Sequence, residues 1–513
     1  MRKLSLIAAG VSLAMAGSAH ATLDTVVDAT IFMSGASAPT NMLREHVTQN
    51  VCSQTAPINV YVDVVRTDPG AGDPSQANPI LEHTTHWVVQ CTAAAGTGAN
   101  LAGKTIAVYK SDVGGSGNGT TPVADSVALP FMNADTTNCS LTRPNQAHNG
   151  GGTYNLYTCG TDDIVNQIPD GGTSDIEPTK FVGSLAPSSG SFIDNGNVQI
   201  KVGPGLVFGI AVSKAFRDQL QADQGLTVGA EDEANMPSLP SSYVTSITQG
   251  KIQRWADEEV YGEAVNLPAT FVGADRIAGT ADDVAAGAYT PFVHICRRVQ
   301  GSGTHAQHMI EYHRTNCMSG SLPMPSQPGL SSGRPAVVEN SSSGNLGVCL
   351  DALDRGVATS SSGITPNITA GRASFALGYQ ATEKNMGLQE NWRYVKVDGF
   401  APTLENAFNG DYDQIYYLSF QNRNDDSYAT GSVRVTPADV GAVNDFYNLN
   451  LEFPGAIVAA ANEGFVHTWG QGGFMQPSAT APAAFNVNDP RTPWTREDAN
   501  GGADSCQPLA RKR

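Results

Sequence analysis

The chain repeats one pattern three times: an apolar run, a short stretch of small and polar residues, and an amphipathic run. Short apolar runs predict buried strands, and apolar residues at every third or fourth position predict helices. The pattern places strands at 26–33, 105–109 and 292–296, and helices starting at 41 and covering 121–129 and 305–314. Strands that alternate with helices indicate an α/β fold with mainly parallel sheets and flanking helices.

Further elements fit the same class. Residues 206–212 predict a fully buried strand, and helices are predicted over 214–221 and 241–255. Residues 133–204 are rich in Gly, Asn, Thr and Pro and include Gly172-Thr173-Ser174-Asp175. The length of 513 residues suggests two to four domains.

Composition narrows the function classes. The chain has 30 Lys and Arg against 48 Asp and Glu, for a formal net charge of -18, and no basic tract before its last few residues. A nucleic-acid binder needs a basic face against the phosphates, so this class is excluded. Hydrophobic residues make up 40% of the chain, which is enough for a large core.

The first residues have the pattern of a signal peptide covering 1–21. Arg2 and Lys3 are basic, 4–17 is apolar, and 19–21 is a small-x-small cleavage site. No cysteine follows the site, so no lipid anchor is expected, and no later apolar run reaches the length of about 20 residues that a membrane helix needs. We expect a periplasmic or extracellular protein without a membrane span in the mature chain.

Eight cysteines in an exported chain favour disulfides. Cys139 and Cys159 flank a Gly- and Asn-rich segment and are the expected pair, and the other pairings stay open. No Cys-x-x-Cys occurs, which argues against a redox motif or a zinc knuckle.

The turns after the three strands are candidate anion sites. Small residues expose backbone N–H groups, and the following helix adds its positive N-terminal dipole. Ser116 lies in such a turn, between glycines. The turn at 297–304 also contains Arg297 and Arg298. A flexible glycine loop is the alternative for the second turn.

Six motifs follow one another in a fixed order along the chain. They are Gly35-Ala36-Ser37-Ala38, Gly115-Ser116-Gly117, Ser174-Asp175, the Gly-Lys-Ile-x-x-Trp of 250–255, the Arg-x-x-Gly-Ser-Gly-Thr of 298–304, and Leu377-Gly378-Tyr379. This series resembles the phosphate-binding proteins of bacterial phosphate ABC importers, which are type II periplasmic binding proteins. The chain departs from them in its length, in Gln300 where they commonly have Asp, and in Pro39 of the first turn.

The resemblance implies a two-lobed fold with the ligand cleft between the lobes. We expect lobe I to consist of 22–205 plus 396–513, with insertions, and lobe II to consist of 206–395. Closure of the lobes over a tetrahedral oxyanion, most simply inorganic phosphate, then serves import through an ABC permease. The resemblance implies no enzyme activity, no catalytic residue, no metal and no cofactor.

The resemblance also assigns the ligand-binding residues. From lobe I they are Ser37, Ala38, Ser116 and Asp175, and from lobe II Arg298, Ser302, Gly303 and Thr304. Arg298 is the natural bidentate partner for two oxyanion oxygens, and we expect no second cation. Asp175 can only accept hydrogen bonds, so it would favour hydrogen phosphate, which carries a proton, over sulfate. The alternative for Asp175 is a turn or helix cap.

Other readings of the sequence remain open. The long insertions favour a secreted or surface protein that reuses the scaffold for adhesion or assembly. A secreted hydrolase ranks below it because neither Ser37 nor Ser116 stands in a complete Gly-x-Ser-x-Gly motif. The Asp- and Gly-rich stretch 273–283 resembles calcium loops, although a solvated loop is the simpler interpretation. We expect His305, His308 and His313 to be ordinary helix residues, and His83 and His86 likewise.

Overall fold

Among the residues that the structure describes, sixteen strands form one mixed sheet. In the computed structural model the described residues are 27–63, 85–255, 290–318, 335–423, 437–451, 455–496 and 503–512, with small gaps inside some of these ranges, and four short strands between 259 and 285. The expected signal peptide, the 273–283 stretch and His83 lie outside the described residues. Within the described part, no helix is long and apolar enough to cross a membrane.

The sheet contains two groups of strands. The first group consists of β1 (Ala29–Gly35), β2 (Asn59–Val62), β3 (His86–Thr92), β4 (Thr105–Ser111), β6 (Cys139–Ala147), β7 (Thr153–Cys159) and β9 (Gly171–Ser174). The second group consists of β16 (His294–Arg298), β17 (Ala336–Asn340), β18 (Ile364–Thr365) and β19 (Ala376–Ala381). Parallel pairs lie within each group, since β1 pairs with β4 and β9, and β16 with β17 and β19. The predicted α/β fold is thus confirmed.

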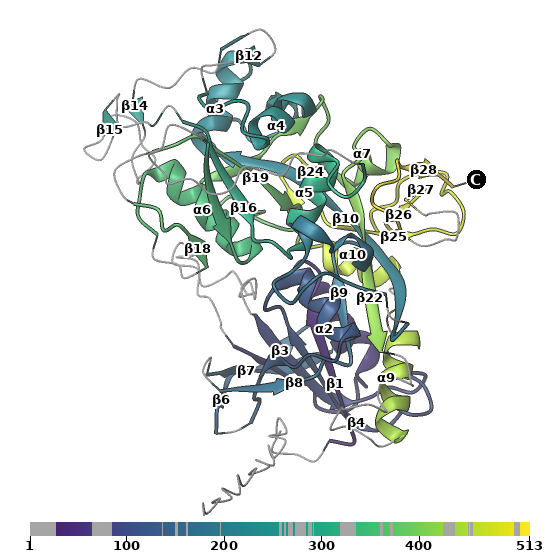
Figure 1. The fold of residues 1–513 in the computed structure, drawn as a ribbon. Coiled ribbons are helices and arrows are strands. Elements are labelled where there is room, and N and C mark those ends of the chain that lie inside the picture. Colours follow the sequence, from purple (N-terminus) through teal and green to yellow (C-terminus); the bar gives the residue numbers. More distant parts are fainter. Residues whose placement is uncertain are drawn as a thin grey trace, which may run out of the picture.

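Two long antiparallel strands connect the groups, as Figure 1 shows. They are β10 (Val198–Ser213) and β22 (Ile415–Arg423). Residues 198–207 of β10 pair with β22, which also pairs with β9, and residues 208–212 pair with β19. The predicted strand 206–212 is therefore only the apolar end of a longer strand. The first residues of β10 are exposed or partly exposed, so the apolar pattern did not predict them as part of the strand.

Helices cover the sheet. They are α1 (Thr40–His46), α2 (Thr121–Ala124), α3 (Lys214–Asp223), α4 (Ser241–Thr248), α5 (Gly303–His313), α6 (Ser343–Arg355), α7 (Leu404–Asn409), α9 (Pro437–Leu449) and α10 (Gly455–Asn462). Two are shorter than predicted. After α2 the chain turns into β5 (Leu129–Met132), and after α4 it turns at Gly250, whose φ of 72° lies in the left-handed region that favours glycine.

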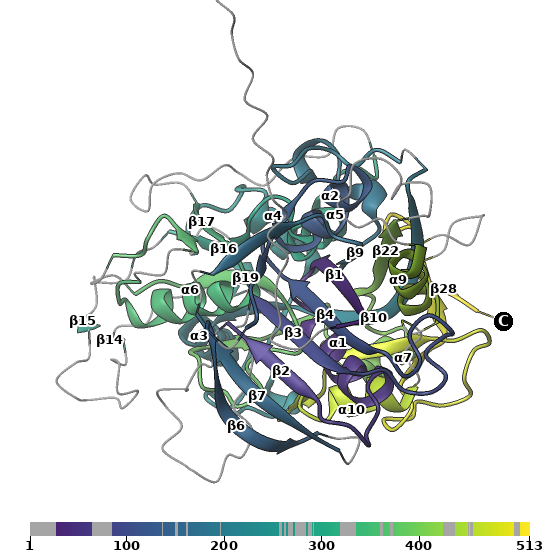
Figure 2. The same cartoon turned by 90° about the horizontal axis from the view of Figure 1, so that it is seen from below.

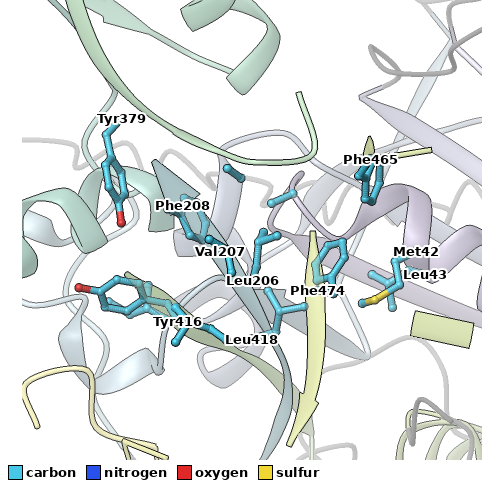
Figure 3. Close-up of a cluster of buried hydrophobic side chains, with 14 of the residues drawn as sticks. Met42, Leu43, Leu206, Val207, Phe208, Tyr379, Tyr416, Leu418, Phe465 and Phe474 are labelled. Atoms are coloured by element: carbon cyan, nitrogen blue, oxygen red, sulfur yellow. The ribbon is translucent and has the colours of Figure 1, made fainter. Parts of the chain in front are cut away.

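A shared apolar core joins the two groups at the crossing strands. Figure 3 shows Phe208 of β10 beside Tyr379 and Tyr416 on one side, and Leu206 beside Phe474 on the other. The rings of Phe208 and Tyr379 are stacked with their centroids 5.5 Å apart. The C-terminal part contributes to this core, and α10 packs beside α1 (Figure 2).

Four disulfides pair all eight cysteines. The bridges are Cys52–Cys91, Cys139–Cys159, Cys296–Cys349 and Cys317–Cys506. The predicted pair Cys139–Cys159 is confirmed and links the hairpin strands β6 and β7. The other bridges join segments that are 39, 53 and 189 residues apart, which sequence spacing alone did not identify.

Candidate functional site

Three loops that are far apart in the sequence meet where β4, β9 and β16 end. The loop after β4 carries Ser116, the segment after β9 begins with Asp175, and the turn after β16 leads through Ser302 into α5. The Asp175 backbone N–H donates to Ser116 Oγ at 3.1 Å, and that hydroxyl donates to Asp175 Oδ2 at 3.1 Å. All three residues are buried.

The first turn of α5 packs directly on this pair. A Cβ atom added to Gly303 would lie 2.3 Å from Ser116 Oγ and 2.7 Å from Asp175 Cβ, so only glycine fits. The Ser302 hydroxyl caps α5 by accepting from the His305 N–H. The positive N-terminal end of an eleven-residue helix therefore faces the Asp175 carboxylate.

Two further hydrogen bonds join the loops. The Gly117 N–H donates to the Gly301 carbonyl oxygen at 2.7 Å, and Gln307 Nε2 donates to the Asp175 carbonyl oxygen at 2.6 Å. Both bonds connect the first strand group with the turn and helix after β16. Residues of the two groups thus touch each other directly at the site.

Arg298 ends β16 and is 4% exposed. Its Nε donates to the Asn340 carbonyl at 3.2 Å, Nη1 to Ser343 Oγ at 2.8 Å, and Nη2 to the Ser341 carbonyl at 2.9 Å. These bonds fix the plane of the guanidinium group. Burial lowers its pKa to about 10, and the nearby carboxylates oppose this shift, so the group is a cation at neutral pH.

Asp175 is a buried carboxylate with unused hydrogen-bonding capacity. Burial raises its pKa to about 6, although Arg298 and the Ser116 hydrogen bond lower it. Within the described part of the chain, Asp175 Oδ1 and Thr304 Oγ1 have no hydrogen-bond partner. Buried polar atoms without partners are costly, and a donor-bearing ligand would satisfy them.

The expectation of a single cation was wrong. Lys110 on β4 is 1% exposed, forms a buried ion pair with Asp112, and interacts electrostatically with Asp175. Its Nζ donates to the Gly35 and Ala36 carbonyls at 3.2 and 3.1 Å. The sequence pattern is only a weak indicator of a buried Lys110, because lysine in an apolar strand is also compatible with an exposed edge.

Glu383 is a second carboxylate that sequence reasoning missed. It is 2% exposed, follows β19, and interacts electrostatically with Arg298 and Asp175. Lys384 Nζ lies 3.5 Å from its Oε1, and burial raises the pKa of the carboxyl. No motif in the sequence pointed to it.

The remaining predicted site residues lie at the first turn. Ala38 is buried and Ser37 is half-buried, and the contacts that join Ser116, Asp175 and Gly303 do not include them. Pro39 precedes α1 as its N-cap residue. Gln300 is exposed, so the residue that departs from the motif faces away from the buried cluster.

The histidines of α5 are buried as well. Burial holds the pKa values of His305 and His308 well below their ordinary value, so both rings are neutral. Thr248 Oγ1 lies 2.9 Å from His313 Nε2. Over the described ranges, no three His, Cys, Asp or Glu side chains are grouped as metal ligands would be.

Comparisons with known proteins give distant likenesses. No family model matches the chain, and no curated protein matches it. A solved structure from Clostridium perfringens, described as a phosphate ABC transporter substrate-binding protein with bound phosphate, is 10% identical with a TM-score of 0.34, and the match covers 84% of this chain and 97% of that one. An ABC-type phosphate transport receptor from Vibrio cholerae is 10% identical with a TM-score of 0.25, covering 50% and 68%. At these TM-scores the likenesses carry no argument about the ligand.

Proposed function

We propose that this chain is an exported solute-binding protein that captures a tetrahedral oxyanion, most simply inorganic phosphate, between its two strand groups for uptake through a membrane permease. The observation that carries the proposal is the meeting of Asp175, the start of α5 and Arg298 in one buried cluster. These groups come from different loops, and no stretch of local structure requires them to meet.

The chemistry of the cluster suits hydrogen phosphate. Arg298 and the helix N-terminus favour a negatively charged ligand, and the Asp175 carboxylate accepts a hydrogen bond from a protonated ligand oxygen. Hydrogen phosphate offers both features, whereas sulfate at neutral pH has no proton to donate. The carboxylate then discriminates against fully deprotonated oxyanions by repulsion.

Binding would be coupled to movement of the two strand groups. β10 and β22 are their continuous connections, so they are the natural hinge. A ligand that contacts Asp175 on one side and Arg298 on the other stabilises the arrangement in which the groups are close. In this proposal the protein carries out no covalent chemistry.

Calorimetric titration tests the proposal. The protein lacking 1–21 is partly unfolded, dialysed to remove bound anions, refolded, and titrated with phosphate, sulfate and arsenate. We expect phosphate binding with a Kd of about 1 μM or tighter, near -8 kcal/mol, and no heat from sulfate. If none of the three anions gives a heat of binding, the proposal is contradicted.

One observation favours a second candidate function, a surface protein that reuses this scaffold for adhesion or assembly. The site loops bond to each other directly, through Gly117 with Gly301 and through Gln307 with Asp175. A cleft filled by its own side chains and backbone is what such a protein would retain. The same titration separates the two candidates, since a repurposed scaffold would bind none of the anions.

A further inference from the structure

The four disulfides differ in their access to solvent. Six cysteines are buried, with exposures of 7% or less: Cys52, Cys91, Cys139, Cys159, Cys296 and Cys349. Cys317 and Cys506 are both partly exposed. A dissolved thiolate must reach a sulfur atom before it can exchange with a disulfide. Cys317–Cys506 is therefore the bridge that a thiol reaches first.

This bridge lies at the far end of the helix that starts at the candidate site. Cys317 follows α5, and Cys506 lies in the C-terminal segment. The neighbours of Cys506 hold that segment to the stretch that begins with Asp175: Asp504 accepts from Lys180 Nζ at 2.6 Å, and the Ser505 N–H and hydroxyl both donate to the Glu177 carboxylate at 2.6 Å.

A non-covalent contact reinforces the bridge. Asn316 Nδ2 donates to the carbonyls of Lys180 and Val182, both at 3.0 Å. In the middle of α5, Gln307 donates to the Asp175 carbonyl at 2.6 Å. The stretch 175–182 thus contacts α5 at its middle and just beyond its C-terminal end. The Cys317–Cys506 bridge adds a covalent link from that end to the C-terminal segment, which itself bonds to the same stretch.

We propose that Cys317–Cys506 is a redox-sensitive clasp that holds α5 against the stretch 175–182, and that its reduction by a dithiol frees the two strand groups to separate. The consequence for ligand exchange rests on the proposed function. The mechanical part of the proposal, which is the restraint on α5, does not depend on any ligand.

The reduction is balanced with a dithiol as the reductant. A thiolate of the dithiol attacks one sulfur of the bridge, the S–S bond breaks, and the released cysteine sulfur takes up a proton. The second dithiol sulfur then attacks the mixed disulfide and releases the other cysteine. The protein gains two electrons and two protons, and the dithiol becomes a disulfide.

The first test uses the native protein and dithiothreitol. Graded reduction is followed by alkylation and mass spectrometry, and amide hydrogen exchange is measured over 175–182 and 303–313. We expect Cys317 and Cys506 to be alkylated at reductant levels that leave the other six cysteines intact, with exchange in both segments at least tenfold faster. Simultaneous alkylation of all eight, or unchanged exchange after selective reduction, would overturn the clasp.

A paired variant, C317S with C506S, provides the second test. It should show the fast exchange of 175–182 and 303–313 without reductant and no further response to dithiothreitol. The control pair C139S with C159S removes a bridge from the β6–β7 hairpin and should leave exchange in both segments unchanged. If both paired variants speed up hydrogen exchange equally, the Cys317–Cys506 bridge only stabilises the fold in general and is not a specific clasp.

The third measurement separates the clasp from the proposed function. The protein is loaded with radiolabelled phosphate, and the rate of phosphate release is compared before and after selective reduction of Cys317–Cys506. We expect release at least tenfold faster after reduction. If phosphate does not bind but hydrogen exchange responds, the proposed function fails and the clasp stands. If phosphate binds and neither release nor exchange responds, the clasp fails and the function stands.

Discussion

Ser116 and Asp175 are joined by two hydrogen bonds through one hydroxyl group. The Asp175 N–H donates to Ser116 Oγ, and the hydroxyl proton is donated to Asp175 Oδ2, both at 3.1 Å. The pair orients the carboxylate so that Oδ2 is occupied. Oδ1 is left without a hydrogen-bond partner among the described residues. In the proposed function, a donor group of the ligand would bind this free Oδ1.

The first prediction concerns anion selectivity. Asp175→Asn removes the charge that repels sulfate and supplies an amide donor, so we expect sulfate binding to become measurable within about tenfold of phosphate. Calorimetry with both anions measures this. Asp411→Asn, at an exposed position, is the control. Unchanged rejection of sulfate would assign Asp175 to a structural role.

The second prediction concerns pH. The pKa of Asp175 is raised to about 6, so folding favours its protonated form relative to the unfolded chain, although the carboxyl is still mostly ionised at neutral pH. The protonated Asp175 carboxyl therefore stabilises the folded protein. This contribution to the free energy of unfolding is fully present below the ordinary Asp pKa of about 4 and is lost as the pH rises through 6. We expect sulfate affinity to increase as the pH falls through 6 in the native protein and to stay flat in Asp175→Asn. A parallel slope in both proteins would argue against this assignment.

The third prediction compares two neighbouring arginines. Arg298→Ala should weaken phosphate binding by about 2 to 5 kcal/mol, which is about 30-fold or more, because a buried cation facing Asp175 is lost. Arg297→Ala removes a partly exposed ion pair with Glu339 and should change the Kd by less than about fivefold. Thermal unfolding of both variants shows whether they remain folded. If both variants bind phosphate with the same Kd, Arg298 is not a ligand-binding residue.

The fourth prediction concerns the space around Gly303. A Cβ atom there would overlap Ser116 and Asp175, so Gly303→Ala should force the helix and the two loops apart. We expect about 1 to 3 kcal/mol of destabilisation, measured by denaturant unfolding, together with weaker phosphate binding. Gly464→Ala is the matched control, because no atom lies within 4 Å of its added Cβ. If Gly303→Ala behaves like this control, the close packing is absent in solution.

The fifth prediction concerns Lys110. Replacing it in Lys110→Met leaves Asp112 as a buried carboxylate without its ion pair, which should lower the free energy of unfolding by about 3 to 5 kcal/mol. The double variant Lys110→Met with Asp112→Leu should recover most of this loss. Denaturant unfolding measures both. A single variant as stable as the native protein would show that the pair is not important for stability.

The sequence by itself determined the local parts of the site. The turns that carry Ser116 and Gly303 are short patterns of strand, small residues and helix start, and their physical causes lie within a few residues. Asp175 was assigned only through the family resemblance. The pair Cys139–Cys159 was predicted because both residues flank one Gly- and Asn-rich segment, and the structure places them in one hairpin. That these turns share one site was an expectation from the family resemblance and not from the local patterns.

Only the tertiary structure decided which distant groups complete the site. Lys110 is buried because carbonyls of the first turn and Asp112 surround its ammonium group, and Glu383 lies near Arg298 because β19 runs beside β16. Cys317 meets Cys506 across 189 residues. None of these contacts leaves a periodic or compositional signal, because burial of a charge and pairing of two distant cysteines depend on partners that the chain brings together only after it folds.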